Sequence, residues 1–480
     1  MQILSSLKRN MNKIVIGYVA AVIMYQVLCL IAPIKAFLYD THLNGISSIL
    51  ALIGLCFWIW DILDEKIFLK AKYSYLLIAT LAILIISSIV YINYGISKSL
   101  KVLIWQIVQM LLIYPACKRI PKDSLKKLIC TIHKGTSTLF VPASIVSICQ
   151  FIIYNGYYIE IGGGEVRQGF QEGRLFGMFS DIYFASVFLL IMITASIYYA
   201  VITSNKFLRI AYICESVIFF IYLVLSRTRS TMLGLLFSVL VFAIVYFRYF
   251  FDNKSRIKMS WIKGLLCIVL VLLSVISTRL VWNMTDKGFQ QLQQLPFSDE
   301  TTQGPVIIHK DSATRTDVSQ KNISNHRFEI WSDYINVTSG NLKSIMLGNS
   351  PGNYMTVIRE LHPDIYIVDY IYNNYPGMYA KGLIYDVHNA YLSIYVESGV
   401  IGTLVFGAFL VLCVFSISKR LLKKVKSLSP ALIATSIMII SIIISAFFDS
   451  DLFFRCTSTS VLFWFIMGLN MNILDTKDKV

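Results

Sequence analysis

The sequence predicts an all-α polytopic membrane protein with about 12 transmembrane helices. Of the 480 residues, 56% are hydrophobic and 15% are charged, and the mean hydropathy is +0.66. Water-soluble folds of this length do not normally show such a balance. Apolar runs of about 20 residues recur along the chain, which is the length that a helix needs to cross the hydrocarbon core. The uneven distribution of Lys and Arg between the loops supports the same fold class.

The apolar runs give the predicted spans in chain order. They lie at 13–34, 46–62, 73–92, 102–117, 136–154, 182–202, 208–226, 231–249, 262–282, 391–418, 431–448 and 459–473. The first run follows Lys8, Arg9 and Lys13, as the apolar part of a signal peptide does, but it is long and lacks a clear cleavage site. We therefore interpret it as the first span. Twelve spans would place both termini on the same side of the membrane.

The basic residues predict which side this is. The loops on the side of the N-terminus hold 26 of the 43 Lys and Arg residues, whereas the short loops on the opposite side hold 8. Because cytoplasmic loops carry the excess of Lys and Arg, both termini are predicted to lie in the cytoplasm. The net charge of +16 is then mainly an orientation signal, and nucleic-acid binding is the weaker interpretation.

A long polar segment interrupts the series of spans. We predict spans 1 to 9 in residues 1–282, a large extracytoplasmic loop in 283–389, and spans 10 to 12 in 390–480. The first part of this loop is rich in Gln, Ser, Thr and Asp, so an extended or mobile structure is expected there. Function is expected to concentrate in this loop, because the other loops are short.

The second part of the loop has a helical pattern. Its apolar residues at helical spacing are Phe328, Trp331, Tyr334 and Ile335. Ser324 or Asn325 is suited to cap the start, and Gly340 follows the end, so a short amphipathic helix is predicted. A turn at 347–354 and a stretch dense in tyrosine come next. The tyrosines suit either an interfacial belt or a surface that stacks on sugar rings.

His388 is the predicted catalytic residue. It precedes a span by only a few residues, at a depth where a lipid-linked substrate would present its head group. An imidazole of near-neutral pKa can take a proton from a hydroxyl there, although a histidine that is merely hydrogen-bonded at the interface is the plainer interpretation. The four histidines of the loop match no metal-ligand spacing, so no metal and no cofactor are predicted.

Four arginines are predicted near membrane level on the same side. Arg227 and Arg229 separate two spans with almost no loop, Arg174 opens the sixth span, and Arg327 starts the amphipathic helix. Cations are disfavoured on that side, so their placement suggests either topological convenience or a bound polyanion such as a diphosphate. The four side chains are expected to form one basic pocket.

Glu215 lies near the middle of the seventh predicted span. An ionisable group inside the membrane is costly and is therefore a functional candidate by default. The alternative is a carboxyl group that is hydrogen-bonded inside the helix bundle.

Four motifs, in this order, resemble the bacterial O-antigen ligase and polymerase family. RLFGMFSDIYFA (174–185) is similar to the family's Arg-x-x-Gly-x-Phe segment, although Ile182 and Tyr183 stand where many members have Pro-Asn. SRTRS (226–230) is similar to a Ser-Arg hairpin between two spans. RFEIW (327–331) with LGNSPGNY (347–354) resembles the helix and turn of the large loop, and HNAYLSIYVESGVIG (388–402) resembles the segment that ends it. The likeness covers roughly 170 to 415.

The resemblance implies a glycosyltransferase in the bacterial inner membrane that takes an oligosaccharide from an undecaprenyl diphosphate carrier. It implies inversion without a metal, with His388 as the general base and with Arg227 and Arg327 on the diphosphate. Arg174 and Arg229 are secondary candidates for the diphosphate. Asn389 and Glu397 are expected to orient His388 or to pack the helix start. The implied partners are the lipid-linked oligosaccharide and membrane lipid, and a chain-length regulator is a further candidate.

Three functions remain open at this point. A polymerase joins repeat units of a surface polysaccharide, whereas a ligase uses the same chemistry with a lipid A core or another terminal acceptor. A flippase or transporter of the same lipid-linked sugars also has about 12 spans. A transporter would predict paired repeats, broken helices and several intramembrane charges, and this chain has one clear intramembrane carboxylate and no detectable halves.

Overall fold

The structure is a computed structural model of the 480-residue chain. It describes residues 2–251, 282–284, 327–380, 382–422, 428–449 and 452–477. The predicted ninth span, except for its last residue, and the first part of the large loop lie outside the described residues. Eight of the described helices are long and apolar enough to cross a membrane.

Each predicted span within the described residues contains a helix. These helices are α1 (Gln2–Leu28), α3 (Ile46–Leu63), α5 (Ser74–Val90), α6 (Ser97–Ile107), α7 (Lys122–Ile152), α8 (Ile182–Ile202), α9 (Lys206–Ser226), α10 (Arg229–Phe251), α18 (Ala390–Leu421), α19 (Pro430–Ser445) and α20 (Ser458–Lys477). A π-helical segment, η3 (Val108–Ile113), continues α6. Short connecting elements are α2 (Ala32–Asp40), α4 (Ile67–Lys70), η1 (Leu43–Gly45), η2 (Ile92–Tyr94), η4 (Ala116–Lys118) and η7 (Ala446–Phe448).

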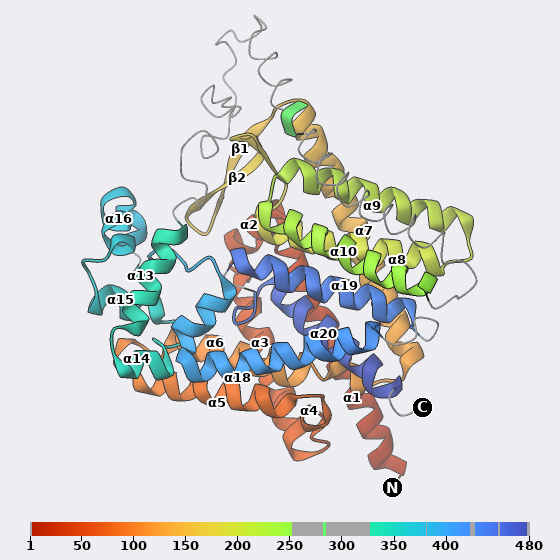
Figure 1. The fold of residues 1–480 in the computed structure, drawn as a ribbon, viewed down its shortest axis with the longest axis horizontal. Helices are drawn as coiled ribbons and strands as arrows, with labels where there is room; N and C mark the ends of the chain where they lie inside the picture. Colours follow the sequence, from red (N-terminus) through yellow and green to blue (C-terminus); the bar gives the residue numbers. More distant parts are fainter. Residues whose placement is uncertain are drawn as a thin grey trace, which may run out of the picture.

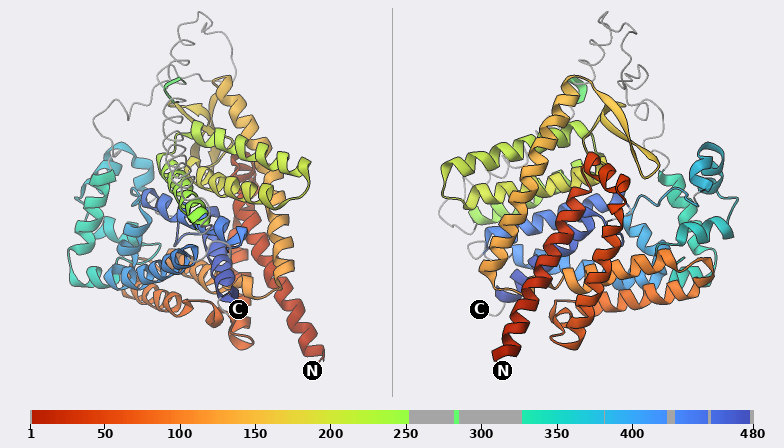
Figure 2. Two further views of the ribbon diagram at one scale, coloured as in Figure 1. Left: turned by 45° about the vertical axis from the view of Figure 1, so that its right-hand side comes forward. Right: turned by 180° about the vertical axis from the view of Figure 1, so that it is seen from behind.

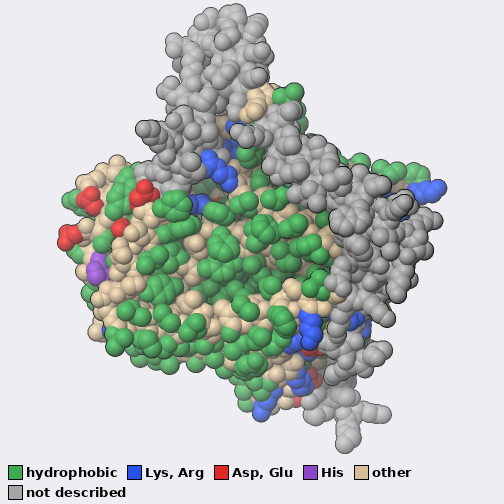
Figure 3. All heavy atoms as spheres, in the orientation of Figure 1, with side chains coloured by type: hydrophobic (Ala, Val, Ile, Leu, Met, Phe, Trp, Pro, Cys, Tyr) green, Lys and Arg blue, Asp and Glu red, His purple; other side chains and the backbone are tan. Residues whose placement is uncertain are grey.

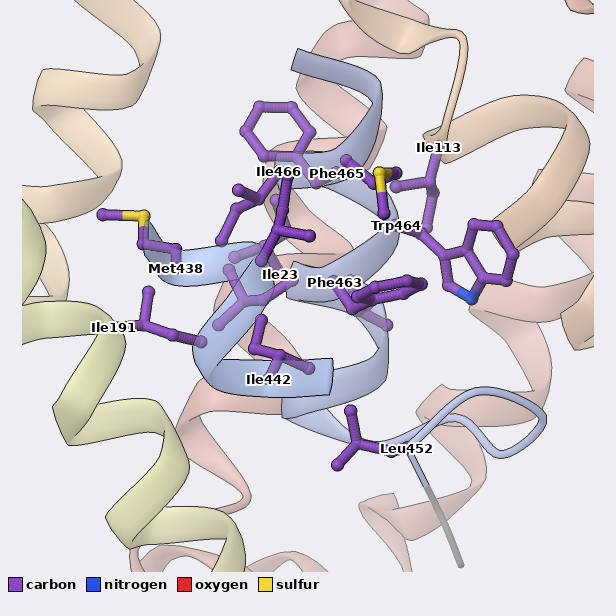
Figure 4. Packing of buried hydrophobic residues seen from close by; sticks show 14 of the residues in the cluster. Ile23, Ile113, Ile191, Met438, Ile442, Leu452, Phe463, Trp464, Phe465 and Ile466 are labelled. Atoms are coloured by element: carbon purple, nitrogen blue, oxygen red, sulfur yellow. The ribbon is translucent and has the colours of Figure 1, made fainter. Parts of the chain in front are cut away.

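The helices form one bundle with different chemistry at its two ends. Both chain termini lie at one end, and the helices of the large loop gather at the other (Figures 1 and 2). A broad band of hydrophobic side chains lies between Lys and Arg residues on the face drawn in Figure 3. Inside the bundle, side chains from α1, α8, α19 and α20 pack together (Figure 4). This arrangement is that of an integral membrane protein.

The structure is consistent with the predicted all-α membrane fold, and a small sheet between α7 and α8 is an addition to it. Its antiparallel strands, in the order β1-β2-β3, are β1 (Gly156–Ile161), β2 (Gly164–Gln171) and β3 (Arg174–Gly177). The β1–β2 turn contains Gly162 and Gly163 at φ +61° and +76°, a conformation that favours glycine. The search for apolar runs missed this hairpin because its strands are too polar and too short to resemble spans. Arg174 therefore stands in a strand, eight residues before α8 begins.

The described part of the large loop is helical. Its helices are α13 (Arg327–Ser339), α14 (Leu342–Leu347), α15 (Tyr354–Leu361), α16 (Tyr366–Asn374) and α17 (Pro376–Ala380). The amphipathic helix predicted before Gly340 is confirmed as α13, although its buried face differs from the predicted one. Ile330, Tyr334 and Val337 are buried, whereas Phe328 and Ile335 are exposed. The predicted capping residues Ser324 and Asn325 lie outside the described residues.

A break in α18 joins the loop helices to the bundle. Gly399 interrupts the helix with φ 65° and ψ −168°. The carbonyl oxygen of Val396 accepts a hydrogen bond from the Asn349 backbone N–H at 2.7 Å, and that of Glu397 accepts one from the Ser87 hydroxyl at 3.1 Å. The turn after α14 and helix α5 thus supply partners for carbonyl groups that a broken helix would otherwise leave unsatisfied.

Substitution of Gly399 by Ala is expected to destabilise this junction. A Cβ atom at Gly399 would lie 2.4 Å from the Met346 carbonyl carbon, and the positive φ adds strain. We expect a loss of about 2 kcal/mol or more in the free energy of unfolding, measured on purified protein in detergent. The control is Gly407→Ala on the same helix, where a Cβ would meet nothing within 4 Å. Equal stability of the two variants would contradict the prediction.

Candidate active site

Helix α13 holds the segment that leads to His388. The Trp331 indole N–H donates to the Val387 carbonyl oxygen at 2.9 Å, and the Tyr334 hydroxyl donates to the Tyr385 carbonyl oxygen. Tyr334 and Val387 have no exposed surface. Trp331 and Tyr334, which the sequence pattern placed on one face of the predicted helix, therefore fix the backbone on either side of Asp386.

His388 lies at the junction between this segment and α18. Its backbone has φ 51°, in the left-handed region, where the chain turns into the helix. Asn389 caps α18, because its side-chain oxygen accepts hydrogen bonds from the backbone N–H groups of Tyr391 and Leu392 at 3.0 and 3.1 Å. Asn389 therefore packs the helix start, which is one of the two roles predicted for it.

The surroundings of His388 favour the neutral imidazole. Burial lowers the pKa of His388 below its usual 6.5, and the positive charge of Arg327 lowers it further. The negative charges of Asp386 and Asp181 oppose this shift. A neutral histidine with a nearby carboxylate has the protonation state that a general base needs near neutral pH.

The charge of Arg327 interacts both with His388 and with Arg229. Arg327 starts α13, and its guanidinium lies 5.7 Å from the centre of the Phe448 ring. Burial lowers the pKa of Arg327, Asp449 and Tyr183 oppose this, and the positive charge of Arg229 lowers it further. Two arginines that repel each other at a partly buried position are suited to share an anion.

Arg227 and Arg174 lie at the end of α9. Arg227 is buried, its backbone has φ 52°, and its Nη2 donates to the Trp282 carbonyl oxygen at 3.1 Å. The Nε of Arg174 donates to the Ser226 carbonyl oxygen at 3.3 Å. This hydrogen bond connects β3 to the residue that precedes Arg227. Hydroxyl groups of Ser186, Ser226 and Thr228 lie 3.0 to 3.1 Å apart and fix the same turn.

The structure thus brings His388 and three helix ends together. Asp181 caps α8 by accepting hydrogen bonds from the N–H groups of Tyr183 and Phe184 at 2.8 and 2.9 Å. Its charge acts on His388, and both Asp181 and Arg174 interact electrostatically with Tyr222. The starts of α8, α10 and α18 therefore meet near the start of α13. N-terminal helix ends carry partial positive charge, which adds to that of the arginines.

Glu397 does not lie with the arginines of this cluster. It has no exposed surface, and its carboxylate binds both terminal nitrogens of Arg455, at 2.7 and 3.3 Å, and the Ser393 hydroxyl at 3.1 Å. Arg455 lies 5.7 Å from the centre of the Tyr354 ring, and the Tyr354 hydroxyl donates to Asp386. Glu397 packs α18 and is connected to the His388 segment through this chain of contacts and through the charge of Asp386.

Glu215 lies apart from the cluster. It is roughly 16 Å from Ser226 along α9, at 1.5 Å per residue. Its Oε1 accepts a hydrogen bond from the Ser137 hydroxyl at 2.6 Å and lies 3.7 Å from His133 Nε2, both on α7. This geometry matches the alternative interpretation, a carboxyl group that is hydrogen-bonded inside the bundle.

Asp181, Asp386 and Arg455 were not singled out from the sequence. Asp181 directly precedes an apolar run, which is a capping signal that could have been recognised. Asp386 is two residues before His388, but spacing alone does not show that its charge acts on the imidazole. Arg455 is 58 residues from Glu397, and no local pattern connects them.

Within the part of the chain that the structure describes, no group of three or more His, Cys, Asp or Glu side chains is arranged to hold a metal ion. His309 and His326 lie outside the described residues. Chemistry without a metal or a cofactor therefore stays a prediction.

The fold and this cluster define a polytopic membrane protein with a basic, histidine-containing site at one end of its bundle. Residues 216–407 match the family model described as O-antigen ligase. The predicted resemblance to the O-antigen ligase and polymerase family is thereby confirmed. The match also supports a membrane enzyme that processes glycans. No curated protein matches the chain.

The pair of Glu397 and Arg455 gives a test of the scaffold. Replacing Arg455 by Met leaves a fully buried carboxylate without its bidentate partner, and we expect a loss of about 3 kcal/mol in the free energy of unfolding. The matched control is Arg167→Met, because the Arg167–Glu172 pair is exposed and is worth at most about 1 kcal/mol. Denaturant unfolding in detergent measures both variants. A loss that is no larger for Arg455→Met would contradict a structural role for the pair.

Proposed function

We propose that the protein is a glycosyltransferase that polymerises undecaprenyl-diphosphate-linked oligosaccharide repeat units of a surface polysaccharide. Its substrates are two lipid-linked oligosaccharides, and the predicted orientation puts the reaction on the outer face of the inner membrane. The observation that carries the proposal is the position of His388 beside Arg327, within the family-matched segment and at the bundle end opposite the termini. The match to the O-antigen ligase family supports the substrate class.

In the proposed reaction, His388 takes the proton from an acceptor hydroxyl while that oxygen attacks the anomeric carbon of the donor sugar. The bond from this carbon to the carrier diphosphate breaks, and its electron pair stays on the diphosphate oxygen. Arg327 and Arg227 stabilise the charge that develops there, and Arg229 and Arg174 contribute to the same positive potential. Attack on the side opposite the leaving group inverts the anomeric centre. No metal takes part in this scheme.

The lowered pKa of His388 suits this role. An imidazole that stays neutral at pH 7 is free to accept a proton, and Asp386 is placed to stabilise the imidazolium that forms. The surrounding arginines attract the diphosphate and disfavour premature protonation of the base. One arrangement of charges therefore serves both substrate binding and proton transfer.

The second candidate is a ligase with the same donor and a lipid A core or another terminal acceptor. It is favoured by the description of the matching family, O-antigen ligase. The two functions differ in the acceptor, so the products distinguish them. A transporter of lipid-linked sugars has no use for a general base at His388.

Replacing His388 by Ala is expected to lower polymerisation about 10²- to 10⁴-fold, the usual contribution of a general base. Arg227→Ala is expected to lower it about 10²-fold or more, because a charge-stabilising group is lost. The measurement is the size distribution of surface polysaccharide in cells that lack the native gene and carry each variant at matched membrane levels. His362→Ala and Arg167→Ala, which lie outside the cluster, serve as controls.

The products separate the three functions. A ladder that is restored by the wild type and the controls, with single lipid-linked units in the two site variants, supports the polymerase. Long chains that form without the protein but stay on the carrier lipid indicate a ligase. Normal ladders from His388→Ala would refute the catalytic role of His388 and favour transport.

The charges around His388 predict opposite shifts in the pH dependence. Activity falls when His388 is protonated, so the acid limb of the profile lies below pH 6.5. Asp386→Asn removes a negative charge, lowers the pKa of His388 further and moves this limb to lower pH. Arg327→Gln removes a positive charge and raises the pKa of His388, so the acid limb of the activity that this variant retains moves to higher pH. Arg327→Lys keeps the charge and leaves the acid limb in place. Purified enzyme with lipid-linked substrate gives the profiles, and shifts in the same direction for Asp386→Asn and Arg327→Gln would contradict the assignment.

A further inference from the structure

A cavity of about 760 Å³ lies inside the bundle, away from the His388 cluster. Its size is in the range of ligand-binding pockets. Most of its lining is apolar and comes from six transmembrane helices, including Ile23 of α1, Ile191 of α8, Met438 of α19 and Ile466 of α20. Figure 4 shows these four side chains in the packed interior of the bundle. The catalytic scheme makes no use of this space.

One end of the cavity is basic. Lys122, Lys126 and Lys127 at the start of α7 belong to its lining, and all three are exposed, whereas Lys134, also in the lining, lies about 10 Å further along the helix than Lys127. Asp123 is the acidic side chain among them, with Lys126 Nζ at 3.9 Å from its carboxylate. This mouth lies at the end of the bundle that carries the termini, because Lys118, just before α7, binds Asp475 of α20 at 2.7 Å (Figure 1). The lysines give the mouth a positive charge.

Tyrosines between these lysines and the apolar part of the cavity mark the membrane interface, because the rings of Tyr199 and Tyr212 pack on His133, about 9 Å further along α7 than Lys127. Tyr198 and Tyr199 lie in the last turn of α8, and Tyr212 lies in the second turn of α9. Aromatic side chains of this kind gather at the level of lipid headgroups. The cavity thus has its polar mouth at headgroup level and its apolar part at the depth of the acyl chains.

The length of the cavity fits one leaflet. Its lining on α8 extends from Phe188 to Tyr199, which is about 16 Å at 1.5 Å per residue. One leaflet contributes about 15 Å of the hydrocarbon core, and the lysines of α7 lie beyond the tyrosines on the headgroup side. An acyl chain that enters at the mouth would end inside the cavity, whereas a polyprenyl chain is too long to be contained in it.

We propose that this cavity is a binding site for an anionic phospholipid of the leaflet at the bundle end that carries the termini. One acyl chain occupies the apolar interior, and the phosphate lies among Lys122, Lys126 and Lys127. Electrostatic attraction selects anionic over zwitterionic headgroups. The bound lipid fills the space between α7, α8 and α20 and so becomes part of the packed bundle.

The test is native mass spectrometry of the full-length protein, released from detergent after addition of phosphatidylglycerol or phosphatidylcholine. We expect retention of one phosphatidylglycerol and weaker retention of phosphatidylcholine. The double variant Lys126→Gln/Lys127→Gln is expected to bind phosphatidylglycerol about tenfold more weakly. Lys66→Gln/Lys70→Gln is the control, because these exposed lysines do not line the cavity.

A second pair of variants tests the interior. Ala195→Phe places a ring inside the cavity and is expected to abolish retention, whereas Ile197→Phe, on the same helix but 52% exposed and outside the lining, is not. If Ala195→Phe does not fold, the lysine variants decide the question alone. Equal retention of both lipids, no effect of the lysine variant, or displacement of phosphatidylglycerol by equimolar undecaprenyl phosphate would overturn the proposal. These outcomes do not depend on glycosyltransferase activity.

Discussion

The break of α18 at Gly399 is the constraint on which the polar end of the molecule depends. A helix that breaks near the membrane leaves carbonyl groups that water does not satisfy, so other parts of the chain must supply donors. Asn349 and Ser87 do so, and this ties the turn after α14 to both α18 and α5. The turn after α14 and helix α18 approach so closely that a Cβ at Gly348 would lie 2.4 Å from the Glu397 carbonyl carbon. Glycine is therefore required on both sides of the contact.

This junction places the loop helices over the start of α18. From there, Trp331 and Tyr334 of α13 hold the backbone around Asp386, and Asn389 caps the helix that follows His388. The backbone on either side of His388 is thus held by partly buried contacts, while Arg327 is the first residue of the same α13. A scaffold of this kind keeps a histidine and an arginine in fixed relation without placing either on a free loop.

The two ends of the bundle serve different physical needs. At the end opposite the termini, burial and the charge of Arg327 keep His388 neutral, and the helix N-termini there carry partial positive charge. At the other end, lysines surround an apolar cavity whose interior suits a hydrocarbon chain. The positive residues that set the orientation of a membrane protein in the bilayer can therefore also bind its lipids.

The sequence by itself determined the membrane class and the helices, because apolar length and the placement of Lys and Arg are local properties of the chain. It also identified His388 and the arginines, since polar residues at span ends stand out from their apolar surroundings. Only the tertiary structure decided which of them meet: Arg327 and Asp181 act on His388, whereas Glu215 is bound by Ser137 and Glu397 by Arg455. The sheet at 156–177 and the packing of Gly348 against α18 were also missed. The strands of the sheet are too polar and too short to resemble spans. The other contacts join residues that are far apart in the chain, and hydrophobic periodicity carries no information about such distances.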